Sequence, residues 1–277
     1  MADLSPRGER LRRELMHARD RAGLSGRGLG AALDSNQGKV WRVESGTQLP
    51  SVPLVKAWLT ACGMSEISPE WQRIVDLAEA AHGETRPWGD LLVGVSHLQG
   101  VARQREIEAG RVRNFQPTVV PGLLQTPEYA ARIIPLADVT GGTDHAATLA
   151  ARLERQQILY EEGHAFEFLL VEAALRWSVA IGDVAPAQLD RIVSLSRLPS
   201  VTVGVVPSGG DAVVPWHNFV IWESADDEPY VTTELFHGEQ RIADTAPVQL
   251  YRALWERMWD SAATADDARE LIRSAVR

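Results

Sequence analysis

The sequence predicts an N-terminal all-α bundle followed by an α+β domain with a small sheet. Two observations lead to this fold class. Short helical segments joined by turns of two to six residues fill the first 82 residues, whereas β-rich segments appear only beyond residue 165. The length of 277 residues suits two domains of ordinary size. We expect a helical domain at residues 1–82, a linker at residues 83–87 and an α+β domain at residues 88–277.

Composition and charge exclude several classes of protein. Hydrophobic residues make up 45% and charged residues 23% of the chain, close to the average for globular proteins, which excludes wholesale disorder and a coiled coil. There is no run of about eighteen apolar residues, and the basic N-terminus lacks the apolar core of a signal peptide, so we expect a cytoplasmic protein without a membrane span. The net charge of −9 is uneven: residues 1–56 carry +4 and the remainder −13. The phosphate groups of DNA would attract the head, residues 1–56, and repel the body, the remainder of the chain.

Five helices are expected in the first domain from apolar spacing and capping residues. Leu11, Leu15, Ala18 and Ala22 recur at helical spacing in the first helix. The other four helices each follow an N-cap residue, namely Ser25, Asn36, Ser51 and Ser68. Glycines end the first, third and fifth helices, at Gly23, Gly46 and Gly83.

The second domain is expected to mix helices and strands. Helical patterns cover residues 96–111, 144–162 and 186–198, and a further helix starts at Thr126. Residues 114–125 read as irregular. Four β-rich segments predict the small sheet: Phe166–Glu172, Val201–Pro207, Phe219–Glu223 and Tyr230–Phe236. Two helices close the chain.

The second and third helices form the strongest motif in the chain. The tight connection Asp34-Ser35 joins them, and four apolar residues are spaced to pack them at a steep angle: Leu29, Leu33, Val40 and Val43. The outer face of the third helix then carries three residues whose types bond to adenine, phosphate and guanine, namely Gln37, Lys39 and Arg42. This pattern indicates a helix-turn-helix that reads the major groove of double-stranded DNA. The alternative is a solvated polar face on a structural bundle.

The run from Ala22 to Ser51, AGLSGRGLGAALDSNQGKVWRVESGTQLPS, resembles the helix-turn-helix of Xre-type repressors. The resemblance implies an ion pair between Arg19 and Glu44 that locks the first helix to the third. It also implies that Gln37 and Arg42 read bases, with Asn36 and Lys39 beside them. The full predicted DNA-binding set is Ser25, Arg27, Asn36, Gln37, Lys39, Trp41 and Arg42.

Two features of this run depart from the Xre pattern. Gly26 stands where related proteins carry a polar residue that grips phosphate. Together with Gly28 and Gly30 it is expected to weaken the second helix, by up to about 1 kcal/mol for each glycine. Trp41 either contacts a thymine methyl group or shields the helix from DNA.

A second resemblance covers much of the remaining chain. The run VPGLLQTPEYA at Val120–Ala130 resembles a signature of actinobacterial regulators, as do Ala151–Gln156, Glu172–Arg176 and Leu198–Val203. These regulators join an Xre-type head to an antitoxin-like C-terminal domain. Their genes commonly neighbour a gene for a very small protein that behaves as a toxin or developmental partner. The resemblance implies a transcriptional regulator whose second domain binds such a partner or an effector.

Other constellations predict no metal, cofactor or catalytic site. The glycines of the second helix follow no strand, so they do not form a phosphate loop. The single cysteine, Cys62, is expected to be a small core residue, and the seven histidines contain no ligand-spaced pair. Ser208 lies in a turn-rich segment without an assignable base. We therefore expect no enzyme, with a hydrolase or transferase as a third, weaker hypothesis.

Nine tryptophans against four tyrosines is an unusual ratio. Core packing is the default explanation, and the alternative is an aromatic-lined pocket formed with three arginines, Arg103, Arg113 and Arg176. Tyr251, Trp255 and Trp259 share one stripe of a late helix. We expect this helix to hold a homodimer, because one recognition helix reads too few base pairs for selective binding. If these residues instead fill the domain's own core, a monomer is the alternative.

The sequence thus supports a DNA-binding transcriptional regulator with a partner-binding second domain. The runner-up is an antitoxin-like protein-binding module with little DNA affinity. The groove face separates the two hypotheses, because Gln37, Lys39 and Arg42 favour DNA whereas Gly26 and Trp41 disfavour it.

Overall fold

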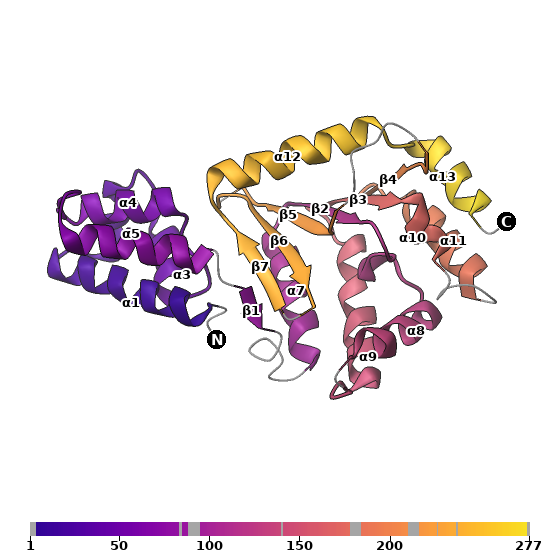
Figure 1. Ribbon diagram of the computed structural model, residues 1–277, viewed down its shortest axis with the longest axis horizontal. Coiled ribbons are helices and arrows are strands. Elements are labelled where there is room, and N and C mark those ends of the chain that lie inside the picture. Colours follow the sequence, from indigo (N-terminus) through magenta and orange to yellow (C-terminus); the bar gives the residue numbers. More distant parts are fainter. Residues whose placement is uncertain are drawn as a thin grey trace. The chain divides into compact units, whose positions relative to one another are not determined.

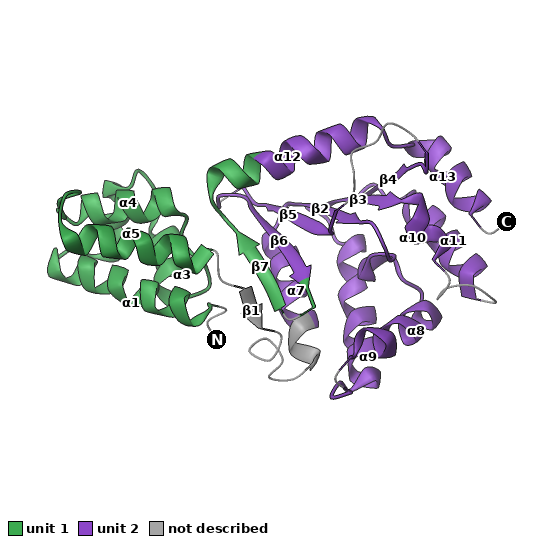
Figure 2. Cartoon of the chain, in the orientation of Figure 1, with its two compact units in different colours: residues 1–86, 235–249 green, residues 87–234, 250–277 purple. Residues whose placement is uncertain are grey.

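A computed structural model describes residues 4–82, 85–87, 95–139, 141–177, 184–209, 216–225, 227–236 and 238–275 of the chain (Figure 1). The chain divides into two compact units (Figure 2). Unit 1 comprises residues 1–86 and 235–249, and unit 2 comprises residues 87–234 and 250–277. The predicted fold class, a helical N-terminal region followed by an α+β domain, is confirmed. Unit 1 additionally includes a short segment from late in the sequence.

The described N-terminal segment of unit 1 forms a helical bundle. Its helices are α1 (Pro6–Arg21), α2 (Gly26–Ala32), α3 (Gln37–Ser45), α4 (Val52–Ala61) and α5 (Pro69–His82). The predicted N-caps are in place, because each side chain accepts a hydrogen bond from the backbone amide three residues later; they are Ser25, Asn36, Ser51 and Ser68. The late segment supplies β7 (Gly238–Ile242) and the start of α12 (Thr245–Asp260).

The core of unit 1 is formed by the apolar stripes of these helices. It includes Leu11, Leu15, Leu29, Val40, Val43, Val55, Trp58, Leu59, Ile74 and Ala78. Two residues expected in this core are less buried than expected, because their helices end just before them, although Cys62 still packs against the core. Ala22 is the exposed C-cap of α1, and Cys62 is the half-buried C-cap of α4. The predicted stop at Gly23 adopts a left-handed φ of 65°, as Gly46 does at 80° after α3, whereas Gly83 lies outside the described residues.

Unit 2 is built on a mixed sheet. Its strands are β2 (Arg111–Gln116), β3 (Ala165–Val171), β4 (Val201–Val206), β5 (Phe219–Glu223) and β6 (Tyr230–Leu235). The division between the two units falls within β1 (Thr85–Pro87). The order runs β6-β5-β2-β3-β4. Strands β2, β3 and β4 are parallel, whereas β5 is antiparallel to both of its neighbours. Helices make the crossovers that parallel strands require.

The helices of unit 2 lie before, between and after these strands (Figure 1). They are α7 (Val95–Glu108), α8 (Pro127–Ala137), α9 (His145–Arg155), α10 (Glu172–Arg176), α11 (Val184–Leu195), the C-terminal part of α12 and α13 (Ala265–Ser274), with 3-10 turns η1 (Gly122–Leu124) and η2 (Gln156–Tyr160). No helix in these described stretches is both long enough and apolar enough to cross a membrane.

The central strand β2 corrects the sequence analysis. Residues 111–116 were expected to end a helix and begin an irregular segment, but they pair with β3 and β5. Val112 and Phe115 are buried, whereas the residues between them are polar and partly exposed, so the segment lacks the alternation of a strand. The four predicted strands are present, and the sheet is larger than expected. The helix expected at residues 144–162 divides into α9 and η2.

Three buried glutamines hold the irregular turn formed by the run VPGLLQT, residues 120–126. The Gln125 amide donates to the Val120 carbonyl at 2.7 Å. The Gln156 amide donates to the carbonyls of Gly122 and Gln125 at 2.8 and 2.9 Å. Gln188 donates to the Leu124 carbonyl and accepts from the Thr126 amide, both at 2.8 Å. These side chains satisfy backbone groups that the irregular turn leaves outside regular secondary structure, as buried polar groups require.

The aromatic residues of α12 pack within unit 2. Trp255 is fully buried, and its ring stacks on Trp259 at 5.5 Å between centroids. Tyr251 is half-buried and lies 5.0 Å from the Phe219 ring. Trp255 therefore belongs to the unit's own core and is not available as a dimer surface, whereas Tyr251 and Trp259 keep part of their surface exposed. The homodimer stays a prediction. The three arginines named for the alternative, an aromatic-lined pocket, each form ion pairs: Arg103 with Glu154, Arg176 with Glu172, and Arg113 with Glu167, Glu223 and Glu256.

Candidate nucleic-acid interface

The turn between α2 and α3 brings the two helices into direct backbone contact. The Ser35 amide donates to the Gly30 carbonyl at 2.8 Å. Asp34 adopts a left-handed φ of 50°, which lets the chain reverse within the turn. A Cβ at Gly30 would stand 3.1 Å from the carbonyl carbon of Asn36. Gly30 therefore allows the close approach of the two helices.

The other two glycines of α2 occupy its first turn. Gly26 is the first helical residue, and the Gly28 amide donates to the Ser25 hydroxyl at 3.0 Å. The loss of stability that glycine causes in a helix interior therefore does not apply to Gly26 and Gly28. The expectation that all three glycines weaken the second helix is corrected for these two. Ser25 and Arg27 are exposed at this end of α2, where backbone amides favour phosphate.

Helix α3 buries one face and exposes the other. Val40 and Val43 are buried in the core of unit 1, whereas Gln37 is exposed and Trp41 is 62% exposed. Lys39 is half-buried at the side of the helix. Asn36 accepts from the Lys39 amide at 2.9 Å through Oδ1, so its carbonyl oxygen serves as a cap. The predicted base-reading residues therefore share the helix with an exposed indole ring.

Arg42 extends back along α3 towards the start of the helix. A Cβ at Gly38 would stand 3.6 Å from Arg42 Nη1 and 3.2 Å from Asn36 Oδ1. The guanidinium group thus lies beside the backbone of Gly38, one turn before its own Cα. The N-terminal end of a recognition helix is the part that contacts base edges. This placement suits Arg42 to bidentate recognition of guanine.

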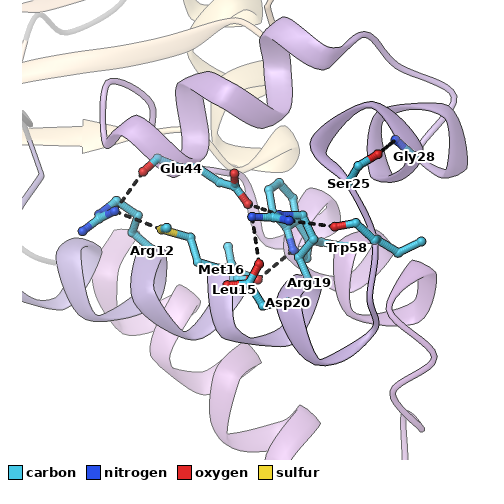
Figure 3. A network of polar contacts seen from close by, with 10 residues as sticks. Arg12, Leu15, Met16, Arg19, Asp20, Ser25, Gly28, Glu44 and Trp58 are labelled. Carbon is cyan, nitrogen blue, oxygen red and sulfur yellow. Dashed lines mark hydrogen bonds and ion pairs between the residues drawn. The ribbon is translucent and has the colours of Figure 1, made fainter.

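Arg19 connects α1 to both ends of the helix-turn-helix (Figure 3). Its Nε lies 2.5 Å from Glu44 Oε1 on α3, and its Nη1 donates to the Leu24 carbonyl at 2.7 Å. The side chains of Arg19 and Glu44 are 17% and 18% exposed, so water screens this ion pair only partly. The hydrogen bond to Glu44 raises the pKa of Arg19 above its ordinary value.

Arg12 provides a second connection from α1 to α3 that the sequence analysis did not name. Its Nη1 donates to the Glu44 carbonyl at 2.8 Å, near the end of α3, where helical carbonyls lack partners within the helix (Figure 3). The same guanidinium group pairs with Glu9 one turn earlier on α1. Two arginines on one face of α1 therefore fix the position of α3. Their spacing of seven residues is the pattern in the sequence that indicates a shared face.

The described residues show no arrangement typical of metal chemistry. They contain no group of three or more histidine, cysteine, aspartate or glutamate residues placed to hold a metal ion. One buried acid in unit 2 has an unusual pKa: burial raises the pKa of Glu106 to about 7, although Arg155 Nε lies 3.6 Å away. Its charge partners are arginines, and it belongs to the packed interior beside α9.

Two family models match the chain. A helix-turn-helix domain matches residues 10–71, which include α2 and α3. A domain of unknown function (DUF5753) matches residues 100–274, more than half of the chain. No curated protein and no solved structure matches the chain. A DNA-binding helix-turn-helix head and a body of uncharacterised chemistry are therefore joined in one polypeptide.

Proposed function

The chain belongs to the family defined by the domain of unknown function (DUF5753), and from this premise we propose that it is a sequence-specific, Xre-type transcriptional regulator. In this proposal, unit 1 reads operator DNA through α3, and unit 2 binds a small protein partner or an effector without catalysis. The match of residues 10–71 to a helix-turn-helix domain supports the DNA-binding part.

One observation carries the proposal: two arginines of α1 bond to Glu44 of α3, and Arg42 extends towards the N-terminal end of the same helix. Arg19 and Arg12 fix α3 against α1, at 2.5 and 2.8 Å from Glu44. Arg42 lies beside Gly38, and Gln37 is exposed on the same helix. A rigid support for a base-reading side chain is what specific recognition needs.

We propose that the regulator acts as a homodimer on a pseudo-palindromic operator. One recognition helix contacts only a few base pairs, so two heads must bind together, about 34 Å apart along B-DNA. The charge distribution suits this arrangement, because residues 1–56 carry +4 and the remaining chain −13. The acidic body is then expected to stay clear of the phosphate backbone.

Selection of binding sites from random double-stranded DNA tests this function. The full chain is expected to enrich one motif with two half-sites separated by one helical turn. Light scattering of the same preparation should give the mass of a dimer. Failure to enrich any motif would remove the regulator hypothesis, whereas an enriched single half-site with a monomer mass would remove only the homodimer.

The second candidate is an antitoxin-like module that binds protein and has little affinity for DNA. Trp41 favours it, because an indole that is 62% exposed on α3 offers a large apolar contact to a protein. The site selection separates the two functions. If the wild type and Trp41→Ala both enrich no motif, the antitoxin-like function stands.

A further inference from the structure

Unit 2 contains a groove along the outer edge of β4. Its volume is about 360 Å³, near the lower end of the range for ligand pockets. Val201, Thr202 and Val203 of β4 line one side, and Trp259 and Arg269 line the other. We propose that this groove binds an extended peptide segment, which pairs with β4 as an added strand and places a carboxylate against Arg269.

The backbone of β4 supports an added strand. On its outer edge, the Val205 amide and carbonyl already bond to Ala263 at 2.9 and 2.8 Å. Because backbone groups alternate between the two edges of a strand, the amide and carbonyl of Val203 point to the same outer edge as those of Val205. The chain itself therefore covers Val205 on this edge and bonds the Val201 amide to the Leu198 carbonyl at 3.1 Å, whereas the backbone of Val203 between them faces the groove. Such strand edges bind extended peptides through main-chain hydrogen bonds.

Trp259 gives the groove a fixed aromatic wall. A Cβ at Gly204 would stand 3.1 Å from Trp259 Cζ3, so the indole packs directly on the backbone of β4. The stacked Trp255 supports the indole from within the core. The indole is itself half-buried and contributes its remaining surface to the groove. An apolar side chain of the peptide would pack against this rigid surface at a low entropic cost.

An arginine at one end of the groove offers a partner to a carboxylate on the peptide. Arg269 lines the groove and lies 2.7 Å from Asp266, whose side chain is 95% exposed. The hydrogen bond from Arg269 lowers the pKa of Asp266, and the charges of Arg197 and Arg273 lower it further. Three arginines thus act on one exposed carboxylate at this end of α13. A peptide carboxylate that approaches Arg269 would be attracted by the same arginines and would share the Arg269 guanidinium group with Asp266.

This inference rests on the partner-binding part of the proposed function and does not depend on DNA. A phage library of random eight-residue peptides, selected on the full chain, supplies the probe. We expect an enriched family that combines alternating apolar residues with an aspartate, a glutamate or a free C-terminal carboxylate. A synthetic peptide of the enriched sequence then allows titration by fluorescence polarisation, while site selection on DNA is run separately, so that failure of either function is recognised independently.

Two comparisons test the geometry. N-methylation of alternate peptide residues gives two sets of peptides, with the methyl groups on one edge or on the other. Methyl groups on the edge that faces β4 should abolish binding, whereas those on the opposite edge should leave the affinity within about twofold of the unmodified peptide. Arg269→Gln should weaken binding about tenfold, whereas the matched variant Arg257→Gln, an exposed arginine on α12, should not. Thr202→Glu places a repelling charge on an exposed β4 residue beside the groove and gives a second variant with little risk to folding.

Several outcomes would overturn the proposal. These are a library with no enriched family, equal sensitivity to N-methylation on both edges, or unchanged affinity in both Arg269→Gln and Thr202→Glu. Light scattering adds one more: if the peptide dissociates a dimer of the full chain, the groove belongs to a second copy and not to a peptide partner. Enrichment of apolar peptides without a carboxylate would likewise reject the assigned role of Arg269.

Discussion

Gly30 lies so close to the backbone of Asn36 that a Cβ at position 30 would stand 3.1 Å from the Asn36 carbonyl carbon and 3.2 Å from the Gln37 nitrogen. Both neighbours are backbone atoms, which cannot move without opening the turn between α2 and α3. Gly30→Ala should therefore destabilise the full chain by about 1–3 kcal/mol, despite the higher helix propensity of alanine. Urea unfolding followed by tryptophan fluorescence measures this change.

The matched control is Gly26→Ala at the start of the same helix. Here the nearest atom to an added Cβ is a Val40 methyl carbon at 3.8 Å, an ordinary contact. Because alanine also restricts the unfolded chain, Gly26→Ala should stabilise by about 0.4–1 kcal/mol. Equal effects of the two substitutions would contradict the role given to Gly30.

Recognition of DNA by Arg42 gives the second prediction. Arg42→Ala should lower the affinity for the selected operator by about 1–3 kcal/mol and relax specificity at one base pair, because one bidentate contact is lost. Gly38→Leu should do the same indirectly, since its side chain would occupy the place of the Arg42 guanidinium group. Binding titrations against the operator and single-base variants measure both effects.

Two further variants separate base reading from general weakening. Gly38→Ala should leave the specificity given by Arg42 unchanged, because its Cβ would stand in ordinary contact with Arg42 Nη1 at 3.6 Å, and the closer Asn36 Oδ1 at 3.2 Å belongs to a side chain that can shift slightly. Lys39→Ala should weaken all sequences similarly and flatten the dependence on salt, as expected for a phosphate contact. A uniform loss in Arg42→Ala would assign Arg42 to phosphate as well.

The sequence was informative where structure depends on local spacing. Caps at Ser25, Asn36 and Ser51 and the buried Val40 and Val43 follow from rules that operate within one turn of helix, and all appear in the structure. The contact between Gly38 and Arg42 is of this kind too, because residues four apart share a helix face. Residue spacing, however, does not determine the direction of a side chain, so the sequence alone does not predict where the Arg42 guanidinium group lies.

Elements that depend on distant partners were missed. Strand β2 is polar at four of its six positions, and its buried Val112 and Phe115 follow no alternation; its pairing with β3 and β5 decides its structure. The stripe of Trp255 and Trp259 has the pattern of an exposed interface or of a core, and the structure buries Trp255 and packs Trp259 on the backbone of Gly204. Long-range packing of this type overrides local propensity.

The ion pair of Arg19 gives the third prediction. Arg19→Ala leaves the Glu44 carboxylate and the Leu24 carbonyl without the donors at 2.5 and 2.7 Å, so it should destabilise the chain by about 1.5–3 kcal/mol. Arg21→Ala is the control, because its pair with Glu70 is exposed to water and should contribute little to stability. Urea unfolding of the two variants under identical salt measures the difference, and equal losses would reject a special role for Arg19.

The last prediction concerns the pH dependence of stability through Glu106. This side chain is 5% exposed, its Oε2 accepts no hydrogen bond, and Arg155 Nε is too distant at 3.6 Å to donate one. Burial therefore outweighs the nearby positive charge and raises the pKa to about 7. The folded state binds the proton more tightly than the unfolded state, so the contribution of Glu106 is complete below about pH 4.5 and is lost as the pH rises through 7.

The full chain should accordingly lose about 3 kcal/mol of unfolding free energy through this group between pH 4.5 and pH 7.5. Glu106→Gln keeps the shape of the neutral acid and should remove that loss, so that the variant is more stable than the wild type at pH 8 and similar to it at pH 5. Glu108→Gln, an exposed acid on the same helix, should follow the wild-type curve. Urea unfolding at half-unit steps of pH measures the three curves. If the wild type and Glu106→Gln run parallel across this range, the Glu106 carboxyl group ionises in the folded protein as it does in the unfolded chain.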